Sequence, residues 1–218
     1  MENNSLYQKS YFRRLPELAE LAPDTFKAFA QFDKLALSDG LLTKKTKELI
    51  AVAVAHVTGC PYCIDLHVTN AKKLEVSKEE MAEAIMVATA LKAGSAMAHG
   101  LNALQAFDGE NNEDLYQKSN LSRFKEFTEL SPDGFHGFNQ FDQAAMKPGL
   151  ISGKDKELIA IAVAHVTGCP YCIEIHTKNA KKLGVSREEL AESILVATAL
   201  KAGSAIAHSV NALNAYDS

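Results

Sequence analysis

Residues 48–74 read ELIAVAVAHVTGCPYCIDLHVTNAKKL, and residues 157–183 repeat them as ELIAIAVAHVTGCPYCIEIHTKNAKKL. Only five positions differ between the two stretches, and the offset of 157 − 48 = 109 is half of the 218-residue chain. Self-similarity at a fixed offset is the signature of a duplicated structural unit. We therefore predict two equal modules, residues 1–109 and residues 110–218.

The same offset relates the rest of the chain without a gap. Residues 6–10 match residues 115–119, and residues 88–96 match residues 197–205. The first third of each module is the more variable part, whereas the stretch around the cysteines is nearly unchanged. The region most alike in the two copies is therefore the place to look for chemistry.

The fold class that the sequence predicts is all-α, with no sheet. Alanine, leucine and lysine dominate, and apolar residues follow helical spacing rather than strict alternation. Proline at a first helical position, Ser/Thr caps and Ser-x-x-Glu boxes mark where helices start. These starts fall at Pro23, Thr43, Cys60 and Ser77, and in the second copy at Pro132, Ser152, Cys169 and Ser186.

Glycines mark the expected helix ends. Gly59 and Gly168 follow the second helix of each module and should end it. Gly94 and Gly203 are expected to kink or break the last segment. Phe26, Phe29 and Phe32 are spaced by three residues, and we expect this aromatic stripe to belong to the core.

Composition bounds the class of protein. With 47% hydrophobic and 23% charged residues, the chain is typical of a globular protein. A net charge of -4 gives no long-range attraction to phosphate backbones or anionic lipid, so we expect neither nucleic-acid nor membrane partners. Residues 1–10 lack the build of a secretory signal, and the alanine- and valine-rich run 50–57 is too short to span a bilayer. We expect a cytoplasmic location, where Cys-x-x-Cys pairs are redox-active or metal-binding rather than structural.

The cysteines start a helix, and that position favours thiolates. If Cys60 is the N-cap and Pro61 the first helical residue, Cys60 and Cys63 face unpaired N–H groups and the positive end of the helix dipole. Such a pair can have a thiol pKa below ~8.5 and can cycle between dithiol and disulfide. His67, four residues after Cys63, lies one turn along the same face as a candidate base.

Glu48 completes a predicted proton relay. It lies 11 residues before Gly59, or ~16 Å of helical rise, whereas His67 is ~10 Å along the following helix. If the two helices fold back antiparallel, Glu48 ends close enough to orient or protonate His67. The second copy supplies the equivalent candidate residues, which are Glu157, Cys169, Cys172 and His176.

Four further residues are candidates for a substrate pocket. Tyr62 and Tyr171 stand between the cysteines, where they are expected to shape the approach to the sulfur. His99 and His208 lie in small, apolar stretches and either line a pocket over the cysteines or are interior histidines with satisfied hydrogen bonds.

Two other chemistries stay open at this point. Cys-x-x-Cys-x-x-x-His with a carboxylate could supply four ligands to zinc, although alanine-rich helical modules do not need a metal to fold. A cofactor-free decarboxylase or isomerase of the lactone type would leave the cysteines without a role.

The spacing from Glu48 to His67, and again from Glu157 to His176, resembles that of the alkylhydroperoxidase D-like / carboxymuconolactone decarboxylase-like family. The Cys-Pro-Tyr-Cys-Ile-Asp-x-His stretch is also similar to peroxidase-like proteins associated with arsenosugar biosynthesis, which are usually single modules. The resemblance implies that Cys63 and Cys172 react with peroxide, that Cys60 and Cys169 resolve, and that the Glu and His residues relay protons.

The resemblance further implies a fold of two tandem alkylhydroperoxidase D-like modules that form an internal pseudo-dimer. It implies a thiol-dependent peroxidase or disulfide oxidoreductase that needs no bound cofactor and no metal. The expected partners are a hydroperoxide substrate and a dithiol reductant of lipoyl or thioredoxin type, with a peroxiredoxin as a further candidate. The family's packing about threefold and twofold axes implies a homo-oligomer, namely a trimer of two-module chains.

Overall fold

The structure, a computed structural model, describes residues 5–109 and 113–218. Residues 1–4, which belong to the segment predicted to lack a secretory signal, lie outside the described residues. So do residues 110–112, where the predicted second module begins. All regular elements in the described part are helical. The first module contains η1 (Lys9–Arg14), α1 (Leu15–Leu21), α2 (Pro23–Ala36), α3 (Lys44–Thr58), α4 (Pro61–Lys73) and α5 (Lys78–Phe107). The second contains η2 (Lys118–Arg123), α6 (Phe124–Leu130), α7 (Pro132–Met146), α8 (Gly153–Thr167), α9 (Pro170–Lys182) and α10 (Arg187–Tyr216).

The caps read from the sequence are confirmed. The Thr43 side chain accepts the N–H of Thr46 at the start of α3, and Gly59 ends that helix in the left-handed conformation with φ 69°. Ser77 and Glu80 form a reciprocal capping box at the start of α5, and the second copy repeats it. These local signals satisfy backbone groups that a helix end leaves unpaired, which is why they fix the boundaries.

The expected break at Gly94 and Gly203 is wrong, because α5 and α10 each run through 30 residues without interruption. The flanking alanines and leucines carry the helix through these glycines. A Cβ on Gly94 would lie 3.7 Å from the Phe138 ring, and one on Gly203 would lie 3.5 Å from the Phe29 ring. The glycines therefore let an aromatic ring of the other module pack closely on the helix.

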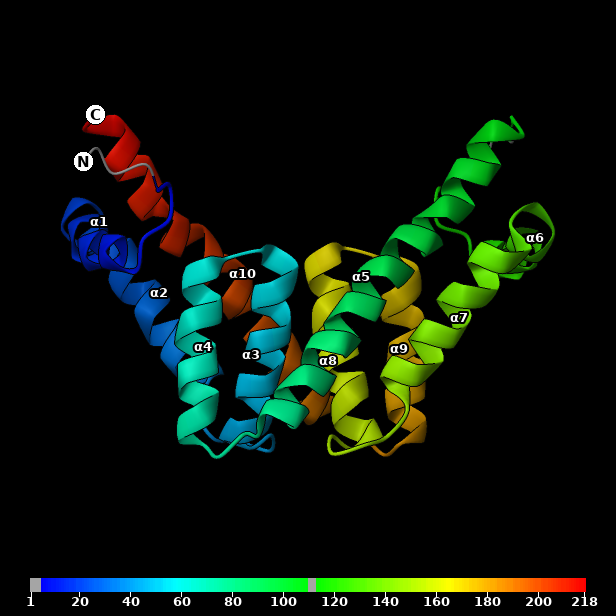
Figure 1. Cartoon of the computed structure of the whole chain (residues 1–218), viewed down its shortest axis with the longest axis horizontal. Coiled ribbons are helices and arrows are strands. Elements are labelled where there is room, and N and C mark those ends of the chain that lie inside the picture. The colour runs from blue at the N-terminus through cyan, green and yellow to red at the C-terminus, as the bar shows by residue number, and fades with distance from the viewer. Residues whose placement is uncertain (1–4, 110–112) are drawn as a thin grey trace.

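Helices α3 and α8 form the centre of the molecule. They pack on each other, and both long helices α5 and α10 pack across the pair (Figure 1). Residues 47–55 of α3 and residues 156–164 of α8 are all buried. Their many alanines let the helix axes approach closely, so the core is continuous from one module to the other.

The two modules exchange their long helices. Figure 1 shows the far end of α10 beside α1 and α2, and the far end of α5 beside α6 and α7. α10 packs on α2, α4 and η1 of the first module, while α5 packs on α7, α9 and η2 of the second. Each cysteine-bearing helix, α4 or α9, is therefore covered by a helix of the opposite module.

Two buried lysines hold the exchanged helices in place. Glu192 of α10 accepts the N–H groups of Leu41 and Leu42 at 2.8 and 3.1 Å, and its Oε2 lies 2.9 Å from the Nζ of Lys47. Burial raises the pKa of Glu192, but the Lys47 ammonium and the two N–H groups outweigh it and lower the pKa overall. Glu83, Leu150, Ile151 and Lys156 repeat the arrangement.

By length and composition, α10 is one helix in the described part of the chain that could cross a membrane. The same helix packs on α2, α3, α4 and α8 and carries Glu192, which forms an ion pair with Lys47. These contacts place α10 within the helical bundle of this fold.

We predict that Gly40→Ala destabilises the protein. A Cβ at Gly40 would lie 2.5 Å from the Glu192 carboxylate, which can move away only by losing its bonds to Leu41, Leu42 and Lys47. The expected loss is about 1–3 kcal/mol in the free energy of unfolding, measured by urea denaturation. Gly137→Ala is the matched control, since nothing lies within 4 Å of its added Cβ and the first module has Ala28 there. Equal stabilities for the two variants would contradict the stabilising role assigned to the contacts of Glu192.

Candidate active site

Both cysteine pairs lie at the start of a helix, as the sequence predicts. Cys60 is the N-cap of α4, and its Sγ accepts the N–H of Cys63 at 3.2 Å. Cys169 is the N-cap of α9, and its Sγ accepts the N–H of Cys172 at 3.4 Å. The sulfur atoms thus take the place of the Ser or Asp oxygen that usually caps a helix, and the positive end of the helix favours negative charge on them.

The two pairs differ in whether their sulfurs are bonded to each other. Cys60 and Cys63 are joined by a disulfide with a Cα–Cα distance of 5.3 Å, whereas Cys169 and Cys172 are free thiols. The N-cap backbone is almost the same in both, with φ and ψ of -86° and 105° at Cys60 and -90° and 105° at Cys169. The helix start can therefore hold the dithiol or the disulfide without a change of backbone conformation.

A glutamate and a histidine pair up beside each set of cysteines. The Nδ1 of His67 lies 2.8 Å from the Oε2 of Glu48, and the Nδ1 of His176 lies 2.8 Å from the Oε2 of Glu157. Glu48 and His67 are both at most 7% exposed. The antiparallel return of α4 along α3 brings them together, as the helical rise predicts, and the carboxylate fixes which ring nitrogen remains available.

Each pair opens into a cavity. Cys63 and His67 line a cavity of about 150 Å³ whose walls include Phe29 and Gly203. In the second module, Cys172, His176 and Glu157 line a larger cavity of about 610 Å³. Phe29 therefore borders a site instead of filling the core, whereas Phe32 does pack against the core. The N-cap cysteines line neither cavity and are fully buried.

Sequence reasoning missed a carboxyl group in each cavity. Asp33 lines the first cavity and Asp142 the second. Burial raises the pKa of both carboxyl groups, and the neighbouring histidine of the relay partly opposes this. The tripeptide Gln-Phe-Asp recurs at 31–33 and 140–142 within an otherwise divergent segment, and this recurrence could have revealed them.

The free pair shares one proton between two sulfurs. A hydrogen bond from the Cys172 thiol lowers the pKa of Cys169 to about 6, against the opposing effect of burial. The Cys172 N–H, His99 and the Ser95 hydroxyl lower it further. The same hydrogen bond and burial raise the pKa of Cys172 well above its usual range. The hydrogen bond between the two sulfurs thus favours negative charge on the buried N-cap sulfur and the proton on the cavity-facing sulfur.

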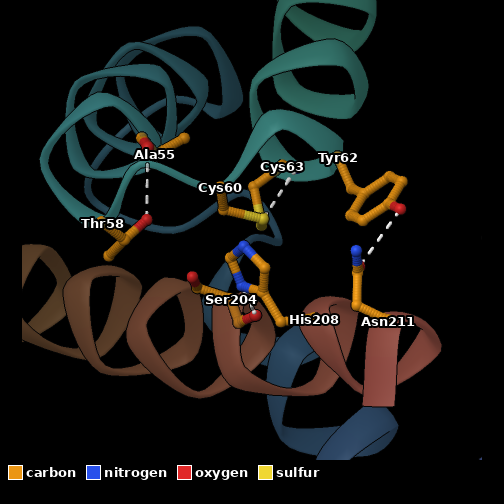
Figure 2. The surroundings of a disulfide bond; sticks show 8 residues. All are labelled: Ala55, Thr58, Cys60, Tyr62, Cys63, Ser204, His208 and Asn211. Carbon is orange, nitrogen blue, oxygen red and sulfur yellow. Dashed lines mark hydrogen bonds between the residues drawn. A yellow bond between two sulfur atoms is a disulfide. The ribbon is translucent and has the colours of Figure 1, made fainter. Parts of the chain in front are cut away.

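The other four candidates contact the cysteines across the module boundary or beside it. Figure 2 shows His208 of α10 with its ring directed toward the Cys60–Cys63 disulfide. His99 of α5 acts electrostatically on Cys169. The Tyr62 hydroxyl donates to Asn211 of α10 at 3.2 Å (Figure 2), and the Tyr171 hydroxyl lies 3.2 Å from Asn120 of η2. Both histidines therefore lie against the opposite module's cysteines, which the sequence did not indicate.

The zinc alternative needs three or four ligands around one point. Within residues 5–109 and 113–218, no three His, Cys, Asp or Glu side chains are grouped so that they could hold a metal ion. Glu48 and His67 are directed at each other, and both sulfurs of the first pair are used in a disulfide. Each Glu–His pair therefore lies beside a cysteine pair as a hydrogen-bonded pair of its own.

Comparison with known proteins gives the family. The carboxymuconolactone decarboxylase family profile matches residues 23–106 and 132–215. The chain is 49% identical over 81 residues to "Uncharacterized protein 4 in cox locus" of Paracoccus denitrificans, which covers 37% of this chain and 73% of that protein. It is 38% identical over 106 residues to an uncharacterized protein of Haemophilus influenzae, covering 49% of this chain and 90% of that one. These relatives correspond to a single module.

A solved structure shows the same arrangement over the whole chain. It is a putative gamma-carboxymuconolactone decarboxylase subunit from Burkholderia xenovorans, with a TM-score of 0.68 and 20% identity. The match covers 95% of each chain, so both modules and their relative placement are included. This protein therefore belongs to the carboxymuconolactone decarboxylase family, whose domain it contains twice.

Proposed function

We propose that the protein is a thiol-dependent peroxidase that also acts as a disulfide oxidoreductase. The observation that carries the proposal is a cavity, present in both modules, that is lined by the second cysteine of the Cys-x-x-Cys pair and by the histidine of the Glu–His pair. A family domain alone does not distinguish a peroxidase from a decarboxylase. The sulfurs at a helix N-terminus make the redox reaction the better explanation of these residues.

The cavity-facing sulfur of Cys63 or Cys172 is the one that a hydroperoxide can reach. The thiol proton passes to His67 or His176, which lines the same cavity and is held in place by its glutamate. The thiolate attacks the outer peroxide oxygen, the O–O bond breaks, and a sulfenic acid forms. The departing alkoxide takes the proton back from the histidine and leaves as an alcohol.

The N-cap sulfur completes the cycle. Cys60 or Cys169 attacks the sulfenic acid sulfur, so the disulfide forms and the hydroxyl group leaves as water after protonation. The low pKa of Cys169 keeps this sulfur as the thiolate that such an attack needs. A dithiol donor of lipoyl or thioredoxin type then reduces the disulfide by exchange and is itself oxidised.

We predict that peroxide-dependent oxidation of dihydrolipoamide by metal-stripped protein is lost in Cys63→Ser/Cys172→Ser. Without the cavity-facing sulfur no sulfenic acid can form, so turnover should fall to the rate without protein. The control is the native chain treated in the same way. Turnover that survives the double substitution would remove peroxide chemistry from these sulfurs and favour a lactone decarboxylase, whereas zinc bound stoichiometrically before stripping would favour a metal site.

The relay predicts a second kinetic effect. Glu48→Gln/Glu157→Gln should lower kcat/KM for the peroxide by about 10²–10⁴-fold, because a neutral amide cannot stabilise the protonated histidine. Glu188→Gln, on the exposed first turn of α10, is the control and should match the native chain. A relay role requires that the loss appear in the peroxide step of stopped-flow traces; a loss confined to the reduction of the disulfide would contradict it.

A further inference from the structure

The histidine that approaches the first cysteine pair comes from the second module. In Figure 2 the His208 ring lies between α10 and the sulfurs of Cys60 and Cys63, with one ring nitrogen directed toward them. The other nitrogen, Nδ1, lies 2.8 Å from the carbonyl oxygen of Ser204. Tyr7 and Tyr62 enclose the ring, with centroid distances of 6.0 and 6.5 Å.

The carbonyl contact fixes the tautomer of this ring. A backbone carbonyl oxygen only accepts hydrogen bonds, so the Nδ1 of His208 must carry a proton. In the neutral ring, Nε2 then presents a lone pair toward the sulfurs, and after protonation it presents an N–H. His208 is therefore set to exchange one proton with a sulfur atom of the opposite module.

The second pair shows the same relation with the thiols free. His99 of α5 acts on Cys169 of α9, and the Ser95 hydroxyl forms a hydrogen bond with the same sulfur. Ser95 is 5% exposed and Cys169 is fully buried, so water does not screen these interactions. Both copies of the repeated arrangement thus bring a histidine of one module toward the cysteines of the other.

We infer that His99 and His208 work in trans, each accepting the proton of the N-cap thiol in the opposite module and then pairing with the thiolate as an imidazolium. The proton leaves Sγ of Cys169 for the ring of His99, or Sγ of Cys60 for Nε2 of His208, and no electrons are exchanged. The proposal builds on the thiol chemistry proposed above and adds a second histidine to each site.

Each site would then contain one histidine for each sulfur. His67 or His176, held by its own module's glutamate, serves the cavity-facing cysteine. His208 or His99 serves the resolving cysteine from the other side. Reduction of a disulfide to two thiols takes up two protons, so each sulfur then has a histidine with which to exchange its proton.

Several other charged or ionisable groups face the second pair and must be kept constant in a test. They lie on α7, α8, α9 and the segment before η2, and they are Asp142, Glu157, Tyr171, Cys172, His176 and Tyr116. All of them belong to the second module, whereas His99 belongs to the first. Within the described residues, His99 is the only ionisable group of the first module that is shown to act on this pair. A substitution at His99 therefore leaves all the other groups unchanged.

The test uses chains with one cysteine pair. Cys60→Ser/Cys63→Ser keeps the second pair, and Cys169→Ser/Cys172→Ser keeps the first, which is reduced before measurement. Thiolate absorbance near 240 nm, followed against pH, gives the midpoint of ionisation, expected near pH 6 for the second pair. In the chain with the second pair, His99→Gln should raise this midpoint by up to about one pH unit, and His208→Gln should leave it unchanged.

The reciprocal pattern is expected in the chain with the first pair, where His208→Gln raises the midpoint and His99→Gln does not. His165→Gln is a control in both, since His165 also bonds a carbonyl, that of Ile161, within its own helix. Shifts within the histidine's own module, or no shift in either chain, would overturn the proposal. Because ionisation is read without peroxide, the result is independent of whether the protein is a peroxidase. Circular dichroism, with His99→Asn and His208→Asn as second variants, separates a lost charge from a lost fold.

Discussion

The burial of α3 against α8 is the constraint on which the rest of the structure depends. Both helices are apolar nearly all round and rich in alanine, so each needs neighbours on every side. One module cannot provide them all, because its own α4 and α5 cover only part of α3. The opposite module supplies α8 and α10 for the remaining faces. The exchange of the long helices follows from this need. Because the helices are exchanged, each site is built from residues of both modules.

Much of the site could be predicted because its determinants are local. The N-cap position of Cys60 follows from Gly59 and Pro61, and the meeting of Glu48 with His67 follows from the rise of two antiparallel helices. The continuity of α5 through Gly94 was not predicted, because the ring of Phe138 that explains the glycine comes from the other module. Asp33 was also missed, since it approaches the relay from α2 with no fixed spacing to the cysteines.

The exchange itself could not be read from the sequence for a physical reason. The copies present nearly identical surfaces, so α10 would find the same contacts on α8 and α9 as α5 would. The helix propensity and the apolar periodicity of a long helix are the same whether it packs within its own module or on the other one. The choice depends on the path of the connecting segments and on pairs such as Glu192 with Lys47, which form only once the helices have crossed. Duplication is thus visible in the sequence, but the partner of each helix is not.

The exchanged helices also change what it means for this protein to carry two copies. In a protein assembled from separate identical chains, the same contacts would be lost on dilution, whereas here the covalent link keeps them at any concentration. The link also makes the halves interdependent, since damage to the long helix of one repeat falls on the cysteines of the other. The close likeness of residues 48–74 and 157–183 is what such mutual dependence would preserve.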